Sequence, residues 1–215
     1  LALRGLHDRA MNASNDMGDR KDMLQEALMA QRQMLIDAIG KPGEEIPQAF
    51  TPYKEVLDVY DEGLELPDDV TIIWPDDNYG YMKRLSSPKE QKRSGRSGVY
   101  YHSSYLGKPH DHLWMNTVSP TLMYEELRKA YDATADRIWL LNAGDIKSCE
   151  FAVDYFLTMA FDIDAFNFER AANYRTEWLC GMLGDQYRNE YQDVVNSFYK
   201  LAFARKPEFL GWGYQ

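Results

Sequence analysis

Hydrophobic residues recur with a helical period along several segments of the chain. Residues 20–39 carry a nearly apolar stripe, and Gly40 followed by Pro42 ends this predicted helix. Ser119, just before a proline, and Ser148 stand at the N-cap positions of two further helices. The remaining predictions are a short helix over residues 52–62, helices to about residues 133 and 161, and a helical hairpin over 166–204 broken at Gly184 and Asp185.

Short apolar runs alternate with these helices and predict strands. The runs are "LALRG" (1–5), "VTIIW" (70–74), "GVYYHSSY" (98–105) and "RIWLLN" (137–142), of which the second and the last are predicted to be buried. Strands that alternate with helices in this way are parallel. Long polar loops follow residues 74 and 105, whereas the connections that enter the strands are short, which is typical of a (β/α) barrel.

The predicted fold class is therefore α/β. We expect residues 1–164 to form the C-terminal half of a (β/α)8 TIM-like catalytic barrel, because only about four strands are visible. Residues 165–215 are predicted to begin an α-helical domain, a hairpin or bundle segment. The chain begins at Leu1, so we expect a piece of a longer polypeptide.

Composition and charge exclude several classes of function. The net charge of −10 disfavours a nucleic-acid partner, which would need a basic face. No apolar run reaches the roughly 20 residues that span a bilayer, so no membrane partner is expected. Cys149 and Cys180 have neither a metal-ligand spacing nor a disulfide framework.

Polar residues cluster where each predicted strand ends, which is where barrel enzymes carry their catalytic groups. The clusters are Arg4, His7 and Asp8 after the first strand; Asp76, Asp77 and Asn78 after the second; His102 and Tyr105 in the third; and Asn142, Asp145 and Lys147 after the fourth. The loop that follows Tyr105 adds His110, Asp111, His112, Trp114 and Asn116.

Each cluster also has an ordinary structural interpretation. Two acids and an asparagine before a glycine form a common turn, and His102 alone is more often structural than catalytic. The pair His110 and His112 lacks a third ligand at a fixed spacing, so we predict no metal site. Glu125 and Glu126 are predicted to lie in the first turn of a helix, where acids complement the helix dipole.

The combination of clusters is more informative than any one of them. Carboxylates on separate strand ends, with Trp74, Tyr79, Tyr105 and Trp114 nearby, predict a polar pocket with aromatic walls. Such a pocket suits sugar rings, and two facing carboxylates are the groups that glycoside hydrolysis requires.

Four long segments carry a resemblance to a known family. They are "LRGLHDRAM", "VTIIWPDDNYGY", "RSGVYYHSSYLGKPHDHLWMNT" and "RIWLLNAGDIKSCEF", in this order over residues 1–165, and "RKPEFL" adds to them near the C-terminus. The sequence resembles glycoside hydrolase family 115, the xylan α-1,2-glucuronidases. The resemblance implies a multidomain chain around a (β/α)₈ barrel that removes 4-O-methyl-D-glucuronic acid from xylan with inversion, without a cofactor or a required metal.

The resemblance also implies site residues. The family's Asp-Asp-Asn matches Asp76, Asp77 and Asn78, and its Arg-Gly-x-x-Asp segment matches Arg4 and Asp8. Many members are richer in acids there, and Leu6, His7 and Arg9 replace some of them. The other matching positions are His102, Tyr105, His110, Asp111, Asn142 and Asp145.

We therefore predict catalytic roles for Asp76 or Asp77, paired with Asp8 or an upstream acid. At most one of the adjacent acids should face the pocket, and the other should hold the loop through backbone hydrogen bonds. Arg4 or Lys147 would meet the uronate carboxylate. The predicted substrate-binding residues are Arg4, Asn78, Tyr79, His102, Tyr105, His110, Asp111, Trp114, Asn142, Asp145 and Lys147.

The expected partner is glucuronoxylan or its oligosaccharides, and a homodimer could form through domains outside this chain. By the resemblance, the protein is expected to be secreted or periplasmic. Two alternatives remain: a non-catalytic carbohydrate-binding or truncated inactive relative, and a metal-dependent sugar isomerase on a similar barrel.

Overall fold

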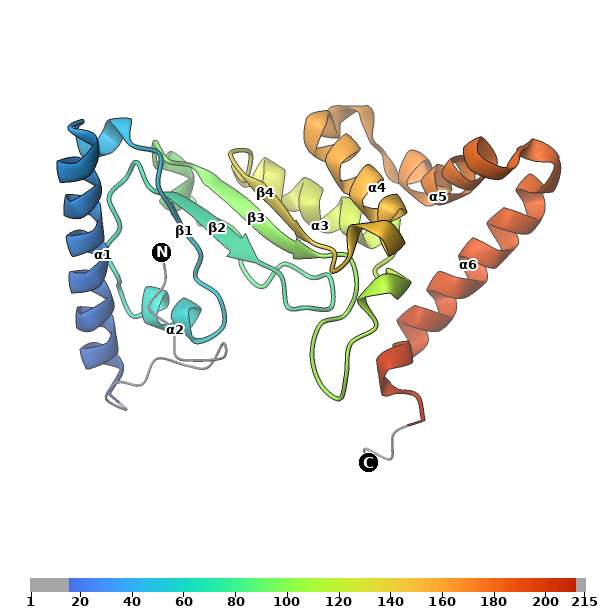
Figure 1. Ribbon diagram of the computed structural model, residues 1–215, viewed down its shortest axis with the longest axis horizontal. Coiled ribbons are helices and arrows are strands. Elements are labelled where there is room, and N and C mark those ends of the chain that lie inside the picture. The colour runs from blue at the N-terminus through green and yellow to red at the C-terminus, as the bar shows by residue number, and fades with distance from the viewer. Residues whose placement is uncertain (1–15, 212–215) are drawn as a thin grey trace. The chain divides into compact units, whose positions relative to one another are not determined.

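The computed structural model describes residues 16–211, so the predicted strand over residues 1–5 lies outside the described part. Helices and strands alternate along the chain (Figure 1). The strands are β1 (Ala49–Phe50), β2 (Thr71–Pro75), β3 (Ser97–His102) and β4 (Trp139–Asn142). The helices are α1 (Met17–Ile39), α2 (Glu55–Asp61), α3 (Pro120–Asp132), α4 (Glu150–Phe161), α5 (Phe168–Leu183) and α6 (Arg188–Ala204).

The four strands form one sheet in the order β1-β2-β3-β4. β1 pairs in parallel with β2, where Ala49 lies opposite Thr71. β3 pairs in parallel with β4, where His102 lies opposite Asn142 at the carboxyl ends of both strands. The predicted α/β class with parallel strands is confirmed, and the arrangement is compatible with part of a barrel.

Several strand predictions need correction. β1 was not predicted, because a strand of two residues is too short to show a period. The third strand ends at His102 rather than at residue 105. β4 begins at Trp139, and the prediction that it is buried is wrong: Leu140 is 43% exposed, and β4 is the outermost strand of the described sheet.

The predicted helix ends are confirmed where glycine supplies a left-handed conformation. Gly40 has a φ of 71°, and its N–H donates to the Ile36 carbonyl, which ends α1. Gly184, at φ 93°, ends α5 and separates it from α6. Two helices, α5 and α6, thus follow residue 162, and their arrangement as a hairpin stays a prediction.

Two predictions at helix starts differ in outcome. Ser119 caps α3 as predicted, because its Oγ accepts a hydrogen bond from the Leu122 N–H at 3.2 Å. Ser148 does not cap α4: the N-cap position is Cys149, and the Ser148 hydroxyl donates to the Asp145 carbonyl instead. Glu126 is not in the first turn of α3, and its buried carboxylate accepts from the Met82 N–H at 2.8 Å.

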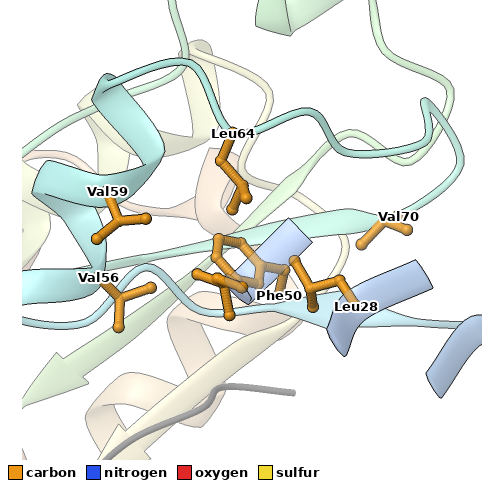
Figure 2. Packing of buried hydrophobic residues seen from close by; sticks show 7 residues of the cluster. Leu28, Phe50, Val56, Val59, Leu64 and Val70 are labelled. Carbon is orange, nitrogen blue, oxygen red and sulfur yellow. The ribbon is translucent and has the colours of Figure 1, made fainter. Parts of the chain in front are cut away.

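The chain divides into two compact units that interleave along the sequence. The first unit comprises Leu1–Pro75, Leu85–Gly98 and Ala133–Ile138. Its core joins α1, β1, α2 and the connection to β2, and Phe50 lies at the centre of the cluster (Figure 2). The buried members of this cluster are Leu24, Leu28, Phe50, Val56, Val59, Leu64 and Val70. Each such side chain contributes about 1.5–3 kcal/mol when it leaves water.

The second unit comprises Asp76–Arg84, Val99–Asp132 and Trp139–Gln215. Within it, α5 contacts α3, α4 and α6. Tyr155 of α4 is fully buried in this unit, and its hydroxyl donates to the Pro120 carbonyl at 2.7 Å. The unit contains the predicted site residues that follow β2, β3 and β4, and the predicted boundary between residues 164 and 165 stays a prediction.

Candidate functional site

The turn after β2 holds its two adjacent acids in different environments. Asp76 is only 1% exposed, whereas Asp77 is exposed. Asp77 Oδ1 accepts from the backbone N–H groups of Tyr79 (2.8 Å) and Tyr81 (3.1 Å), which closes the turn. Asn78 adopts a left-handed φ of 67°, a conformation that asparagine tolerates, and its side-chain amide donates to the Leu106 carbonyl.

Asp76 accepts three hydrogen bonds, two of them from His102. Its Oδ1 lies 2.6 Å from His102 Nδ1 and 3.1 Å from the Asn78 backbone nitrogen, and its Oδ2 accepts from the His102 backbone N–H at 2.9 Å. Because a carboxylate accepts hydrogen bonds, it favours a proton on Nδ1 of the imidazole. Nε2 of His102 is buried and has no hydrogen-bond partner among residues 16–211. The pair therefore presents an imidazole in a fixed orientation.

Tyr100 links this pair to the end of β4. Its ring lies 5.0 Å from the His102 ring, and its hydroxyl accepts from the Asn142 side-chain amide at 2.9 Å. Asp76, His102 and Asn142, which were predicted from three different strand ends, are thus connected within the second unit. Sequence reasoning did not single out Tyr100. This residue lies two positions before His102 in β3, so both side chains point to the same face of the strand.

The loop that follows β3 contains Tyr105 and Asp111, and it contacts Tyr79 of the turn after β2. The Tyr79 and Tyr105 rings lie 4.7 Å apart, and Tyr105 is 6% exposed. Burial and a hydrogen bond with Tyr79 raise the pKa of the Tyr105 phenol to about 12. Asp111 is exposed and accepts from the Gly107 N–H at 2.7 Å, so it supports the loop backbone.

The histidine pair in this loop is an aromatic contact. The His110 and His112 rings lie 4.5 Å apart, and the Trp114 ring is 6.5 Å from that of His112. Trp114 is 61% exposed. Within the described residues, no group of three His, Cys, Asp or Glu side chains could hold a metal ion. The expected aromatic wall includes Tyr79, Tyr105 and Trp114.

Three expected residues lie outside this cluster, and two more are not described. Trp74 is wrong as a pocket wall, because it is fully buried and its indole N–H donates to Ser86 Oγ. Asp145 is exposed, and Lys147 is 98% exposed with Glu150 as its ion-pair partner at 3.6 Å. The predicted Arg4 and Asp8 lie outside the described residues.

The short strand β1 adds an acid that sequence reasoning missed. Glu55, half-buried, is the first residue of α2 and follows the carboxyl end of β1. The preceding Lys54 has a φ of 52° and a ψ of −124°, which is strained for a residue with a side chain. Strain of this kind gathers at functional sites, so Glu55 becomes a candidate of the first unit. Because β1 was not predicted, the residues after its carboxyl end were not considered as candidates.

A pocket of about 470 Å³ lies between the turn after β2 and the C-terminal segment of the second unit. Its walls include Tyr79, Tyr81 and Phe209, with Arg205 and Lys206 at its side. Lys206 donates to the Thr117 carbonyl, and its burial lowers the pKa of its ammonium group. These C-terminal residues were not predicted as site residues.

No helix within the described part of the chain is both long and apolar enough to cross a membrane.

No curated protein matches the sequence at a significant level. A solved structure, reported as a novel family GH115 4-O-methyl-α-glucuronidase, BtGH115A, with specificity for decorated arabinogalactans, shares 42% identity with this chain at a TM-score of 0.91. The match covers 98% of this chain and 28% of that one.

The model of one family also matches the sequence. Glycosyl hydrolase family 115 matches residues 1–209, nearly the whole chain. The three resembling segments that the structure describes contain β2, β3 and β4, in the predicted order. The chain belongs to glycosyl hydrolase family 115.

Proposed function

We propose that the chain forms part of an α-glucuronidase that hydrolyses (4-O-methyl)-glucuronic acid side chains from a polysaccharide. The observation that carries the proposal is the 42% identity, over 98% of the chain, to a 4-O-methyl-α-glucuronidase. Asp76, His102 and Asn142 supply hydrogen-bonding groups at adjacent strand ends, which supports a sugar-binding role. The chain spans 28% of that relative's length.

The proposed mechanism is inversion by two carboxylates. One carboxylic acid protonates the leaving oxygen, and a carboxylate on the other side of the sugar activates water, about 6.5–9.5 Å away. Asp77 is one candidate, because it is exposed and both hydrogen bonds from the turn go to the same carboxylate oxygen, Oδ1. Asp8 or an upstream acid, as predicted from the sequence, is the proposed partner acid.

Asp76 takes a positioning role in this proposal. Its carboxylate is committed to His102 and to the turn, so its contribution comes through the orientation of the imidazole. Of the two residues predicted to bind sugar hydroxyls, His102 is fully buried and Asn142 is half-buried, so Asn142 is the one that a sugar can reach. Arg4 supplies the cation for the uronate carboxylate, since Lys147 is exposed and pairs with Glu150.

The proposed substrate is glucuronoxylan, and the relative's preference makes decorated arabinogalactan the necessary comparison. Full-length enzyme is incubated with each polysaccharide, and released 4-O-methylglucuronate is quantified. Proton NMR of the first product formed then gives the anomer. Release of the β-anomer from an α-linked side chain supports inversion, and release of the α-anomer contradicts it.

The alternative is a non-catalytic carbohydrate-binding relative. The observation that favours it is that both acids of the turn accept hydrogen bonds from the backbone, as structural acids do. Binding of the polysaccharide without release of uronic acid by the full-length chain would support this alternative.

A further inference from the structure

The pocket beside the turn after β2 has a composition that the cleavage site does not explain. Its lining includes the side chains of Tyr81, Leu122 and Phe203, and apolar surface predominates in it. Tyr81 is 41% exposed and Phe203 is 77% exposed, so solvent reaches both side chains. The two residues are far apart in the sequence. Exposed rings with few polar groups between them are typical of a ligand site.

The floor of this pocket is held in place by aromatic packing. Tyr105 lies between Tyr79 and Phe209, with ring centroids at 4.7 Å and 5.2 Å. The Tyr105 hydroxyl donates to the Lys108 carbonyl at 2.5 Å, which fixes the central ring. Because Tyr79 and Phe209 also line the pocket, its shape exists before any ligand arrives.

Both cations of the pocket are held by backbone carbonyls. Arg205 donates to the Phe209 carbonyl at 2.8 Å, and Lys206 donates to the Thr117 carbonyl at 3.2 Å. Burial lowers the pKa of Lys206, and the acids Asp77 and Glu208 oppose this effect. Both cations are therefore engaged before a ligand binds.

From these contacts we infer that the pocket is an accessory subsite for a neutral pyranose chain. The rings of Tyr81 and Phe203 take the apolar faces of the sugars, and the lysine and arginine donors meet their hydroxyl groups. A uronate ligand is disfavoured, because backbone carbonyls already hold both cations. The inference rests on the proposed polysaccharide substrate and names the part of it, the uncharged main chain, that this pocket holds.

The test measures binding directly, so it does not depend on turnover. Full-length protein is titrated calorimetrically with linear xylohexaose and, separately, with glucuronic acid, at low and high salt. Tyr81→Ala and Phe203→Ala are each expected to weaken xylohexaose binding about three- to tenfold, since one ring contact is lost in each. Phe161→Ala, which removes a ring that is 92% exposed on α4, is the matched control and should leave binding unchanged.

The outcomes separate this inference from the proposed function. Unchanged xylohexaose affinity in both ring variants would overturn it, as would tight, salt-sensitive glucuronate binding that the same variants weaken. Release of glucuronate from a short aldobiouronic acid is measured in parallel, and the control Phe161→Ala should leave it unchanged. If the parent enzyme releases no glucuronate from this substrate, the proposed function is contradicted, and the binding result is judged separately.

Discussion

Replacing Asp76 by asparagine should cost stability as well as activity. The substitution keeps the size of the side chain but leaves one oxygen where the carboxylate has two. With the amide oxygen at the Oδ1 position, the NH₂ group faces the His102 backbone N–H, and the 2.9 Å hydrogen bond becomes a contact between two donors. The opposite orientation loses both the Asn78 bond and the 2.6 Å bond to His102 Nδ1.

The expected magnitude follows from these contacts. A hydrogen bond to a charged acceptor contributes about 1.5–3 kcal/mol, and a buried donor without a partner costs about 1–3 kcal/mol. Because Asp76 is 1% exposed, water cannot replace the lost acceptor. Asp76→Asn should therefore destabilise the folded state by about 2–4 kcal/mol.

Asp77→Asn is the matched comparison. Its Oδ1 accepts both backbone hydrogen bonds, and an asparagine oxygen can accept the same two. The stability cost should be below about 1 kcal/mol, as for surface substitutions away from the core. Loss of proton transfer should lower turnover by about 10²–10⁴-fold.

The assay uses full-length enzyme, with unfolding midpoints in denaturant beside turnover on aldouronic acid. An Asp76→Asn variant with an unchanged midpoint would refute the burial argument. Near-normal turnover in both variants would show that the two acids are turn residues and that the catalytic assignment is wrong. Loss of activity in Asp76→Asn with a changed pH profile would support its action through His102, since a folding defect alone lowers the amount of active enzyme and leaves the profile in place.

Three further predictions test other parts of the structure. Gly98→Ala should destabilise by several kcal/mol, since the new Cβ would lie 2.1 Å from the Ile138 carbonyl oxygen, whereas Gly181→Ala in α5 should stabilise by about 0.5–1 kcal/mol in the same denaturant titration. The pKa of Tyr105 is raised from 10.0 to about 12, so the stability it contributes is complete below pH 10 and lost between pH 10 and 12. Tyr105→Phe should then lose less stability over that window than the parent enzyme. Glu55→Gln should lower turnover about 10²-fold or more if this acid takes part in proton transfer, and normal turnover would remove it from the candidates.

The main elements of the fold could be predicted because their signals are local. The apolar stripe of α1, the glycine at its end and the proline after Ser119 each depend on neighbouring residues only. β1 could not be predicted, because two residues carry no period and its pairing partner lies about twenty residues away. The exposure of β4 depends on its place in the sheet, which the apolar run "RIWLLN" does not contain.

The candidate site was predictable in its location but not in its roles. Parallel strands place their carboxyl ends together, so listing the polar residues after each strand found Asp76, His102 and Asn142. Glu55 was missed because β1 was not predicted. Listing the polar residues after the end of β1 would have included it.

The difference between Asp76 and Asp77 is the part that sequence could not supply. The two residues have the same side chain and adjacent positions, and either could form a turn or donate a proton. What separates them is the chain direction after Pro75, which sends one carboxylate under β3 to meet His102 and leaves the other at the surface. An interaction across 26 residues decides this, and it follows from the pairing of two strands. The role of an acid at a strand end therefore depends on what the neighbouring strand places opposite it, so each such acid in this family should be judged by the donors that its neighbour presents.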